Sequence, residues 1–266
     1  MGLVVPRRAR YQGAMLNTII HGSPTEYPPL LIAHGLYGSG RNWGVIARRL
    51  ADQRQVIAVD MRNHGDSPWS DRHDYPVMAE DLAEVIAHHG GQADVIGHSM
   101  GGKTAMMLAL NHGEMVRRLV VADIAPVPYS HTQLPFIAAM RAVDLSRVER
   151  RSDAEEMLAE QGVEKALQSF FTQSLDLPGK RWRLNLDALA ANMPAIMSFP
   201  ERSGHWSGPT LFLAGAESDY VRPEHRDRIR ALFPAARFAK IPGAGHWLHA
   251  DKPREFEAAA RTFLNA

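Results

Sequence analysis

Short apolar runs alternate with amphipathic segments along most of this chain. The amphipathic segments carry apolar residues at three- and four-residue spacing, the period of a helix with one buried face. The apolar runs are rich in Val, Ile, Leu and Phe, which favours buried strands. The runs cover residues 30–35, 55–61, 93–99, 117–125, 209–216 and 236–243, and the helical segments cover 42–53, 75–90, 100–113, 223–234 and 252–266. This alternation predicts an α/β fold with a mostly parallel sheet flanked by helices, and residues 14–22 predict one antiparallel strand.

The alternation stops between the run that ends at residue 125 and the run that begins at residue 209. Residues 127–207 contain helical patterns and no convincing strand. Ligands of open α/β sheets bind at the carboxyl ends of the strands, so an insertion there is placed to cover a site. We therefore predict a core of residues 1–126 and 208–266, with an inserted helical cap of residues 127–207.

Composition narrows the classes of function. The 266 residues carry a net charge of +1, which provides no general attraction to nucleic acid or to an anionic membrane. The chain has no cysteine, which excludes disulfides, a thiol nucleophile and thiolate metal ligands. It shows neither a signal-peptide core nor the roughly 18 uncharged apolar residues of a membrane span. We expect a cytoplasmic monomer or homodimer that acts on a small molecule and holds no metal.

A candidate nucleophile lies where the third predicted core strand meets a helical segment. Residues 97–101 read Gly-His-Ser-Met-Gly, a G-x-S-x-G motif. In this context the motif forms a sharp strand-to-helix turn that exposes the serine hydroxyl, and the helix N-terminus adds partial positive charge. We predict that Ser99 is a catalytic nucleophile rather than part of a structural turn.

A glycine-rich loop after the strand at 30–33 is the candidate oxyanion hole. It reads His34-Gly35-Leu36-Tyr37-Gly38, and it has neither the P-loop spacing nor the G-x-G-x-x-G of a phosphate-binding loop. In folds with a serine at such a turn, this loop supplies one backbone N–H and the residue after the serine supplies another. We therefore predict that the amides of Leu36 and Met100 bind the oxyanion.

The general base is expected on the loop after the last strand. Of the 13 histidines, His246 in the stretch KIPGAGHWLHADKP occupies that loop, and His249 is the alternative three residues later. Trp247 adjoins this loop and Tyr37 adjoins the oxyanion loop, so we predict that both contact substrate, together with His34. Lys103, one turn after Ser99, is expected at the rim of the core or paired with a carboxylate.

The carboxylate that orients the histidine is less obvious. It commonly lies three residues after the glycine that ends the preceding strand, and that position, counted from Gly215, holds Ser218. Asp219 is displaced by one residue and would point elsewhere. Asp123 follows the apolar run before the cap, and a buried carboxylate there needs a partner such as an imidazole. The residues favour Asp123 and leave Asp219 as the alternative.

Six stretches of the sequence are more specific than the G-x-S-x-G motif alone. They read HGLYGSGRNW (34–43), VDMRNHGDSP (59–68), YPVMAEDLAEVI (75–86), IGHSMGGK (96–103), DIAPVPY (123–129) and AGHWLHADKP (244–253). With them the chain resembles the α/β-hydrolase superfamily and, within it, the bacterial YbfF-type esterases. The resemblance implies an eight-stranded sheet with the cap between its sixth and seventh strands. It also places the triad acid at Asp123, and implies hydrolysis of short-acyl esters, with thioesters as a second class, without a cofactor.

The predicted function is thus a serine carboxylesterase in which Ser99 attacks, His246 transfers the proton and Asp123 orients the imidazole. A serine at position 99 excludes dehalogenases and epoxide hydrolases of this fold, which need a carboxylate nucleophile. A cofactor-free haloperoxidase or perhydrolase and a carbon–carbon bond hydrolase would use the same triad, so both remain open. A noncatalytic ligand-binding module is the alternative from another class.

Overall fold

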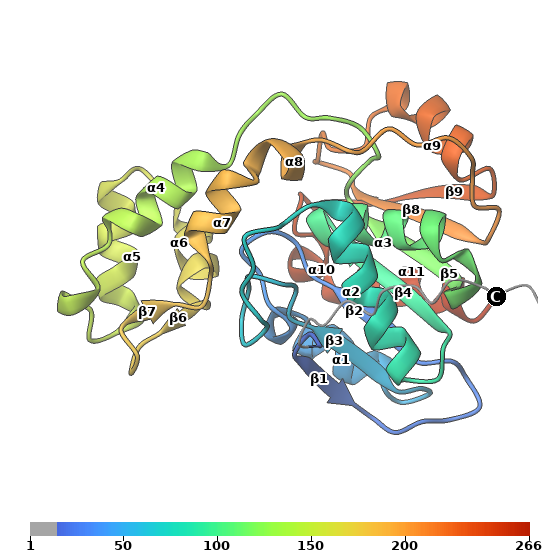
Figure 1. The fold of residues 1–266 in the computed structure, drawn as a ribbon, viewed down its shortest axis with the longest axis horizontal. Helices are drawn as coiled ribbons and strands as arrows, with labels where there is room; N and C mark the ends of the chain where they lie inside the picture. The colour runs from blue at the N-terminus through green and yellow to red at the C-terminus, as the bar shows by residue number, and fades with distance from the viewer. Residues whose placement is uncertain (1–14) are drawn as a thin grey trace, which may run out of the picture.

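A twisted, mostly parallel sheet forms the centre of the protein (Figure 1). The computed structural model describes residues 15–266. The strands are β1 (Thr18–His21), β2 (Leu30–Ala33), β3 (Val56–Val59), β4 (Ala93–His98), β5 (Val116–Ala122), β8 (Thr210–Gly215) and β9 (Ala236–Ile241). They lie in the order β1-β3-β2-β4-β5-β8-β9, and only β1 runs antiparallel to its neighbour. The predicted α/β fold and the antiparallel N-terminal strand are confirmed.

Helices cover both faces of this sheet, which is why β2, β3, β4 and β8 are buried along their whole length. One face packs against α2 (Tyr75–His88), α3 (Met100–Asn111) and α9 (Arg226–Leu232). The other packs against α1 (Gly44–Leu50), α10 (Leu248–Asp251) and α11 (Pro253–Leu264). Short 3₁₀ turns occupy Gly40–Trp43, Gly113–Met115, Leu145–Arg147 and Pro223–His225. The helical segments predicted from periodicity are all present, and each helix is shorter than its predicted segment at one or both ends.

The number of strands differs from the prediction. Residues 15–266 contribute seven strands to the main sheet where eight were predicted, and in this range the cap follows β5. The chain's own pattern contains seven strand-like segments, and the eighth came only from the family resemblance.

The cap forms a separate helical layer beside the core, joined to it through α8 (Figure 1). Its helices are α4 (Leu134–Ala142), α5 (Arg151–Glu160), α6 (Lys165–Thr172), α7 (Leu186–Ala191) and α8 (Met193–Met197). They enclose a third apolar cluster that includes Met140, Leu158, Phe171 and Trp182. A two-stranded ribbon, β6 (Leu175–Asp176) and β7 (Arg181–Trp182), corrects the expectation of a cap without strands. Strands of two residues are too short to produce a readable alternation.

The sheet brings distant parts of the chain to one edge. Adjacent strands β2, β4, β5, β8 and β9 are parallel, so their carboxyl ends lie side by side. The loops that follow these ends contain the candidate oxyanion loop, Ser99, Asp123, Ser218 and His246 in turn. This is the edge at which ligands bind in open α/β sheets.

Candidate active site

Ser99 occupies a strained turn between β4 and α3. Its φ of 53° and ψ of −118° are rare for a residue with a side chain and cost about 1–3 kcal/mol. The flanking glycines make the turn possible, because a Cβ at Gly97 would lie 2.3 Å from the Gly101 carbonyl oxygen and one at Gly101 2.2 Å from that of Ala33. The strand–turn–helix context predicted for the G-x-S-x-G motif is therefore present.

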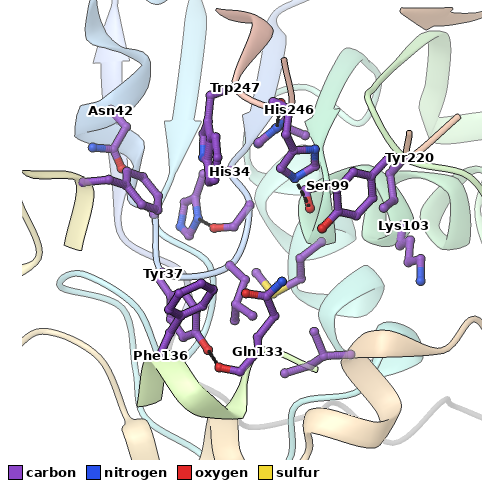
Figure 2. A pocket seen from close by; sticks show the side chains of 18 of the residues that line it. His34, Tyr37, Asn42, Ser99, Lys103, Gln133, Phe136, Tyr220, His246 and Trp247 are labelled. Atoms are coloured by element: carbon purple, nitrogen blue, oxygen red, sulfur yellow. Dashed lines mark hydrogen bonds between the residues drawn. The ribbon is translucent and has the colours of Figure 1, made fainter. Parts of the chain in front are cut away.

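Three side chains from three loops form one hydrogen-bonded chain. The Nε2 atom of His246 lies 3.1 Å from Ser99 Oγ, and its Nδ1 atom lies 2.7 Å from Asp123 Oδ2. Because the carboxylate can only accept, Nδ1 donates to it and Nε2 is left to accept the serine proton. Figure 2 shows His246 directly above Ser99 at one side of the pocket. This geometry is that of a nucleophile, a base and an orienting acid.

Asp123 is fully buried and accepts three hydrogen bonds. Besides His246, the Gly215 amide donates to its Oδ1 at 3.0 Å and the Ser218 hydroxyl to its Oδ2 at 2.5 Å. Asp219 is exposed, and within residues 15–266 no hydrogen bond joins its carboxylate to His246. Ser218, at the position where an aspartate was expected, thus donates to the acid that faces the histidine.

We expect Ser218→Ala to lower kcat for ester hydrolysis about tenfold, the effect of losing one hydrogen bond to a charged group. The remaining donors, Gly215 and His246, would leave Asp123 less firmly held. Steady-state kinetics on p-nitrophenyl acetate measures the effect, and Ser218→Thr, which keeps the hydroxyl, serves as the matched control. An unchanged kcat in the alanine variant would show that the Gly215 amide is sufficient to hold Asp123.

The candidate oxyanion loop lies against the nucleophile. A Cβ on Gly35 would be 3.2 Å from the Cβ of Ser99. The peptide that joins Gly35 to Leu36 therefore lies next to the serine. His34 orients this peptide: its Nδ1–H donates to the Gly35 carbonyl at 2.7 Å, while its Nε2 accepts from the Met61 amide at 2.9 Å. Burial lowers the pKa of His34, which keeps Nε2 available as an acceptor. His34 lines the pocket, but both of its ring nitrogens are bonded to backbone.

Tyr37 connects the same loop to the cap. His64 Nε2 accepts from the Tyr37 amide at 3.1 Å, which fixes the left-handed backbone there at a φ of 65°. From the cap, the Ser174 hydroxyl donates to the Tyr37 carbonyl at 3.0 Å, and the Tyr37 hydroxyl donates to the Gln133 carbonyl at 3.0 Å. The ring lines the pocket and meets Phe171 edge-on. Tyr37 therefore presents its ring to the pocket, while its hydroxyl is bonded to the cap.

The environment of His246 includes groups that the sequence did not single out. The Tyr220 ring stacks on the imidazole with centroids 4.0 Å apart, and His98 Nε2 donates to the His246 carbonyl at 2.8 Å. Trp247 lies edge-on to His246 and lines the pocket. His249 packs instead against the fully buried Trp43 ring, 4.0 Å away and nearly parallel, and burial lowers its pKa to about 3. It is a buried packing residue at the wall of the pocket.

The core and the cap line one pocket over Ser99 (Figure 2). Its empty space is about 910 Å³, open solvent included. The core lining includes Asn42, Lys103, Tyr220 and Trp247, and the cap lining includes Gln133, Phe136, Leu167, Phe170, Ile196 and Met197. No acidic side chain is among the residues that line it. The cavity therefore suits a largely apolar ligand with a few polar contacts.

Within residues 15–266, Lys103 lacks the carboxylate partner that was one of its two predicted environments. It is 1% exposed and its Nζ donates to the Ser198 carbonyl at 2.7 Å. In the described part of the chain no carboxylate forms an ion pair with it. Burial lowers its pKa to about 7. The expectation of a carboxylate partner is thus wrong: main-chain carbonyls take that place, and a sequence pattern cannot show them.

Residues 15–266 contain neither a metal-binding cluster nor a membrane-spanning helix. No group of three or more His, Asp or Glu side chains is arranged to hold a metal ion there. No helix in the same range is long and apolar enough to cross a bilayer.

Comparison with known proteins agrees with this architecture. A family model described as alpha/beta hydrolase fold matches residues 28–253. The mouse (Mus musculus) protein named sn-1-specific diacylglycerol lipase ABHD11 is 44% identical over 249 residues, which cover 89% of this chain and 81% of that protein. Esterase YbfF of Escherichia coli K12 is 40% identical, with 89% and 93% covered. A solved structure titled Marine microorganism esterase has a TM-score of 0.88 at 39% identity, covering 94% of this chain and 99% of that one.

The matched family model spans the sheet from β2 to β9, the cap and the loops at the carboxyl edge. The relatives align over nearly the whole chain rather than over the G-x-S-x-G motif alone. The resemblance inferred from six short stretches is therefore confirmed, and the chain belongs to the α/β-hydrolase fold family.

Proposed function

We propose that this chain is a serine carboxylesterase that hydrolyses short-acyl esters, and thioesters as a second class, through an acyl-enzyme. The observation that carries the proposal is the chain of contacts from Asp123 through His246 to Ser99, 2.7 and 3.1 Å long. Two relatives are named esterases, one from Escherichia coli and one titled as a marine microorganism esterase, and this supports the proposal. This chain aligns with more than nine-tenths of the length of each.

In the first half-reaction Ser99 Oγ attacks the ester carbonyl carbon and its proton passes to His246 Nε2. Asp123 holds the imidazole in the tautomer that can accept this proton and stabilises the imidazolium that forms. The tetrahedral oxyanion accepts hydrogen bonds from the Leu36 and Met100 amides. His246 then gives the proton to the alkoxy oxygen as the carbon–oxygen bond breaks, and the alcohol leaves.

The second half-reaction regenerates the serine. His246 takes a proton from water, whose oxygen attacks the acyl carbon of the acyl-enzyme. The same amides stabilise the second oxyanion. When the bond to Ser99 Oγ breaks, His246 returns the proton to that oxygen and the carboxylic acid leaves. Every proton and electron pair in this cycle is supplied by the three side chains, the ester and water, so the proposed reaction uses no cofactor.

The pocket supports an apolar acyl group. The cap side chains Phe136, Leu167 and Phe170 and the core side chain Trp247 form an aromatic and aliphatic wall around Ser99. The mouse relative is named an sn-1-specific diacylglycerol lipase, so diacylglycerol is a further candidate substrate. The net charge of +1 gives the chain no general attraction to nucleic acid or to an anionic membrane, which agrees with a small-molecule substrate. A cytoplasmic monomer or homodimer is proposed with this activity.

Hydrolysis of p-nitrophenyl esters from acetyl to dodecanoyl tests the proposal, with the Ser99→Ala variant as the blank. We expect kcat/KM to peak at short acyl chains and to fall as the chain outgrows the pocket. A fluorophosphonate probe, which reacts only with an activated serine, is applied to the same samples. Labelling without turnover on any ester would favour the perhydrolase or carbon–carbon bond hydrolase. Failure of the probe to label wild type would favour a noncatalytic binding module.

A further inference from the structure

One buried charge close to the site has no part in the proposed reaction. Lys103 lies one helical turn after Ser99 on α3 and is 1% exposed. Its Nζ donates to the carbonyls of Ser198 and Met197, at 2.7 and 3.4 Å. The same atom lies 4.7 Å from the centre of the Tyr129 ring and 5.7 Å from that of Tyr75. Burying an ammonium group is costly even with such partners, and an apolar side chain would avoid the cost.

The atoms that Lys103 holds belong to the cap junction, which we define as residues 127–129 on entry to the cap and 196–198 on return from it. The Tyr129 amide donates to the Met197 carbonyl at 2.9 Å, which binds the entering segment to the returning one. The Tyr75 hydroxyl, from α2, donates to the Ile196 carbonyl at 2.5 Å. Three successive carbonyls of the returning segment are thus held, and Lys103 holds two of them.

The cap junction is also a wall of the active-site pocket. Ile196, Met197 and Tyr129 line it together with Lys103 itself. In Figure 2 Lys103 lies beyond Ser99, on the side of Tyr220 and away from Trp247 and Asn42. Because Lys103 lies one turn after Ser99, its bonds to the Met197 and Ser198 carbonyls join the nucleophile helix to this wall.

We propose that Lys103 is a positioning residue that holds the returning segment of the cap against the nucleophile helix and thereby sets the longest acyl chain that the site accepts. The proposal rests on the esterase function proposed above. The lysine contacts no reacting atom and acts through Ile196 and Met197. Its loss would let this wall retreat, so that long acyl chains fit better and short chains are held less well.

Lys103→Met tests this inference, because methionine has a similar length and cannot donate a hydrogen bond. We expect the ratio of kcat/KM for the decanoyl ester to that for the butyryl ester to rise about tenfold, as for the loss of one charge-assisted hydrogen bond. Lys103→Gln, which keeps an amide donor, should lie between the variant and wild type. Lys165→Met is the matched control, since Lys165 is an exposed cap lysine paired with Glu155.

Hydrogen exchange followed by mass spectrometry provides a readout that does not depend on turnover. Amides in peptides covering residues 193–201 should exchange faster in Lys103→Met than in wild type, while those of β4 stay protected. An unchanged acyl-chain ratio, or an equal loss on both esters, would overturn the inference in favour of a purely structural lysine. Unchanged exchange would overturn it as well. If wild type hydrolysed no ester, the proposed function would fail, and the positioning role would be decided by exchange alone.

Discussion

Replacing Ser99 by alanine should lower kcat for ester hydrolysis by about 10⁶-fold, the effect of removing the nucleophile from a serine triad. The substitution removes only Oγ, whose recorded contact is the one to His246 at 3.1 Å. Alanine inherits the same strained backbone as serine, so the turn gains no new clash. We therefore expect an unchanged circular dichroism spectrum beside the lost turnover. Kinetics on p-nitrophenyl acetate measures the loss of turnover. Labelling by a fluorophosphonate probe, which needs the Ser99 hydroxyl, should be lost with it.

Ser146→Ala is a suitable control for this variant. Its hydroxyl is exposed in the cap and bonds only to Asp144 of its own turn, so labelling and turnover should both stay at the wild-type level. Turnover by Ser99→Ala well above the uncatalysed rate would show that another group attacks the ester. Labelling of that variant by the probe would likewise identify a second activated nucleophile and remove Ser99 from the proposed role.

The fold was predictable because its signals are local. The run of apolar residues into Gly97-His98-Ser99 and the helical pattern after it lie within one stretch of chain, and β4, the turn and α3 follow it closely. The carboxyl-edge arrangement then follows from parallel strands alone. The two strands of the cap could not be predicted in this way, because two residues are too few to show an alternation of apolar and polar positions.

The acid could not be decided from local pattern, because its partners are remote in sequence. Ser218 stands where the pattern expects an aspartate, and the pattern cannot show that its hydroxyl reaches Asp123, 95 residues earlier. A serine in that place was itself a usable signal, since a neutral donor there implies an acceptor nearby.

The remaining unpredicted contacts have the same origin. The two nitrogens of His34 bond to backbone, one of them to Met61 on the next loop. Lys103 bonds to carbonyls that arrive with the cap. Any residue type can present a main-chain carbonyl or amide, so sequence carries no trace of such partners. The side chains that carry chemistry were recognisable, whereas the backbone groups that position them were not.

We expect Asp123→Asn to lower kcat by about 10³- to 10⁴-fold while leaving KM nearly unchanged. The Gly215 amide donates to Oδ1, so the oxygen of asparagine would face that amide. Its NH₂ group would then take the place of Oδ2, which faces His246 and the Ser218 hydroxyl. An NH₂ group stabilises the tautomer of His246 that carries its proton on Nε2. That tautomer cannot accept the proton of Ser99, so the base would be present but wrongly protonated. Steady-state kinetics over the p-nitrophenyl series measures kcat and KM separately.

Asp219→Asn is the matched control, because it makes the same chemical change on the alternative carboxylate. Asp219 is exposed, and within residues 15–266 its one hydrogen bond is accepted by its backbone carbonyl from Arg222. Its loss of charge should therefore change kcat by no more than about twofold. The two variants together decide between the carboxylates. The opposite result, a large loss at Asp219 and a small one at Asp123, would mean that the loop after β8 rearranges in solution to bring Asp219 to His246. Equal and large losses would mean that both carboxylates act on His246.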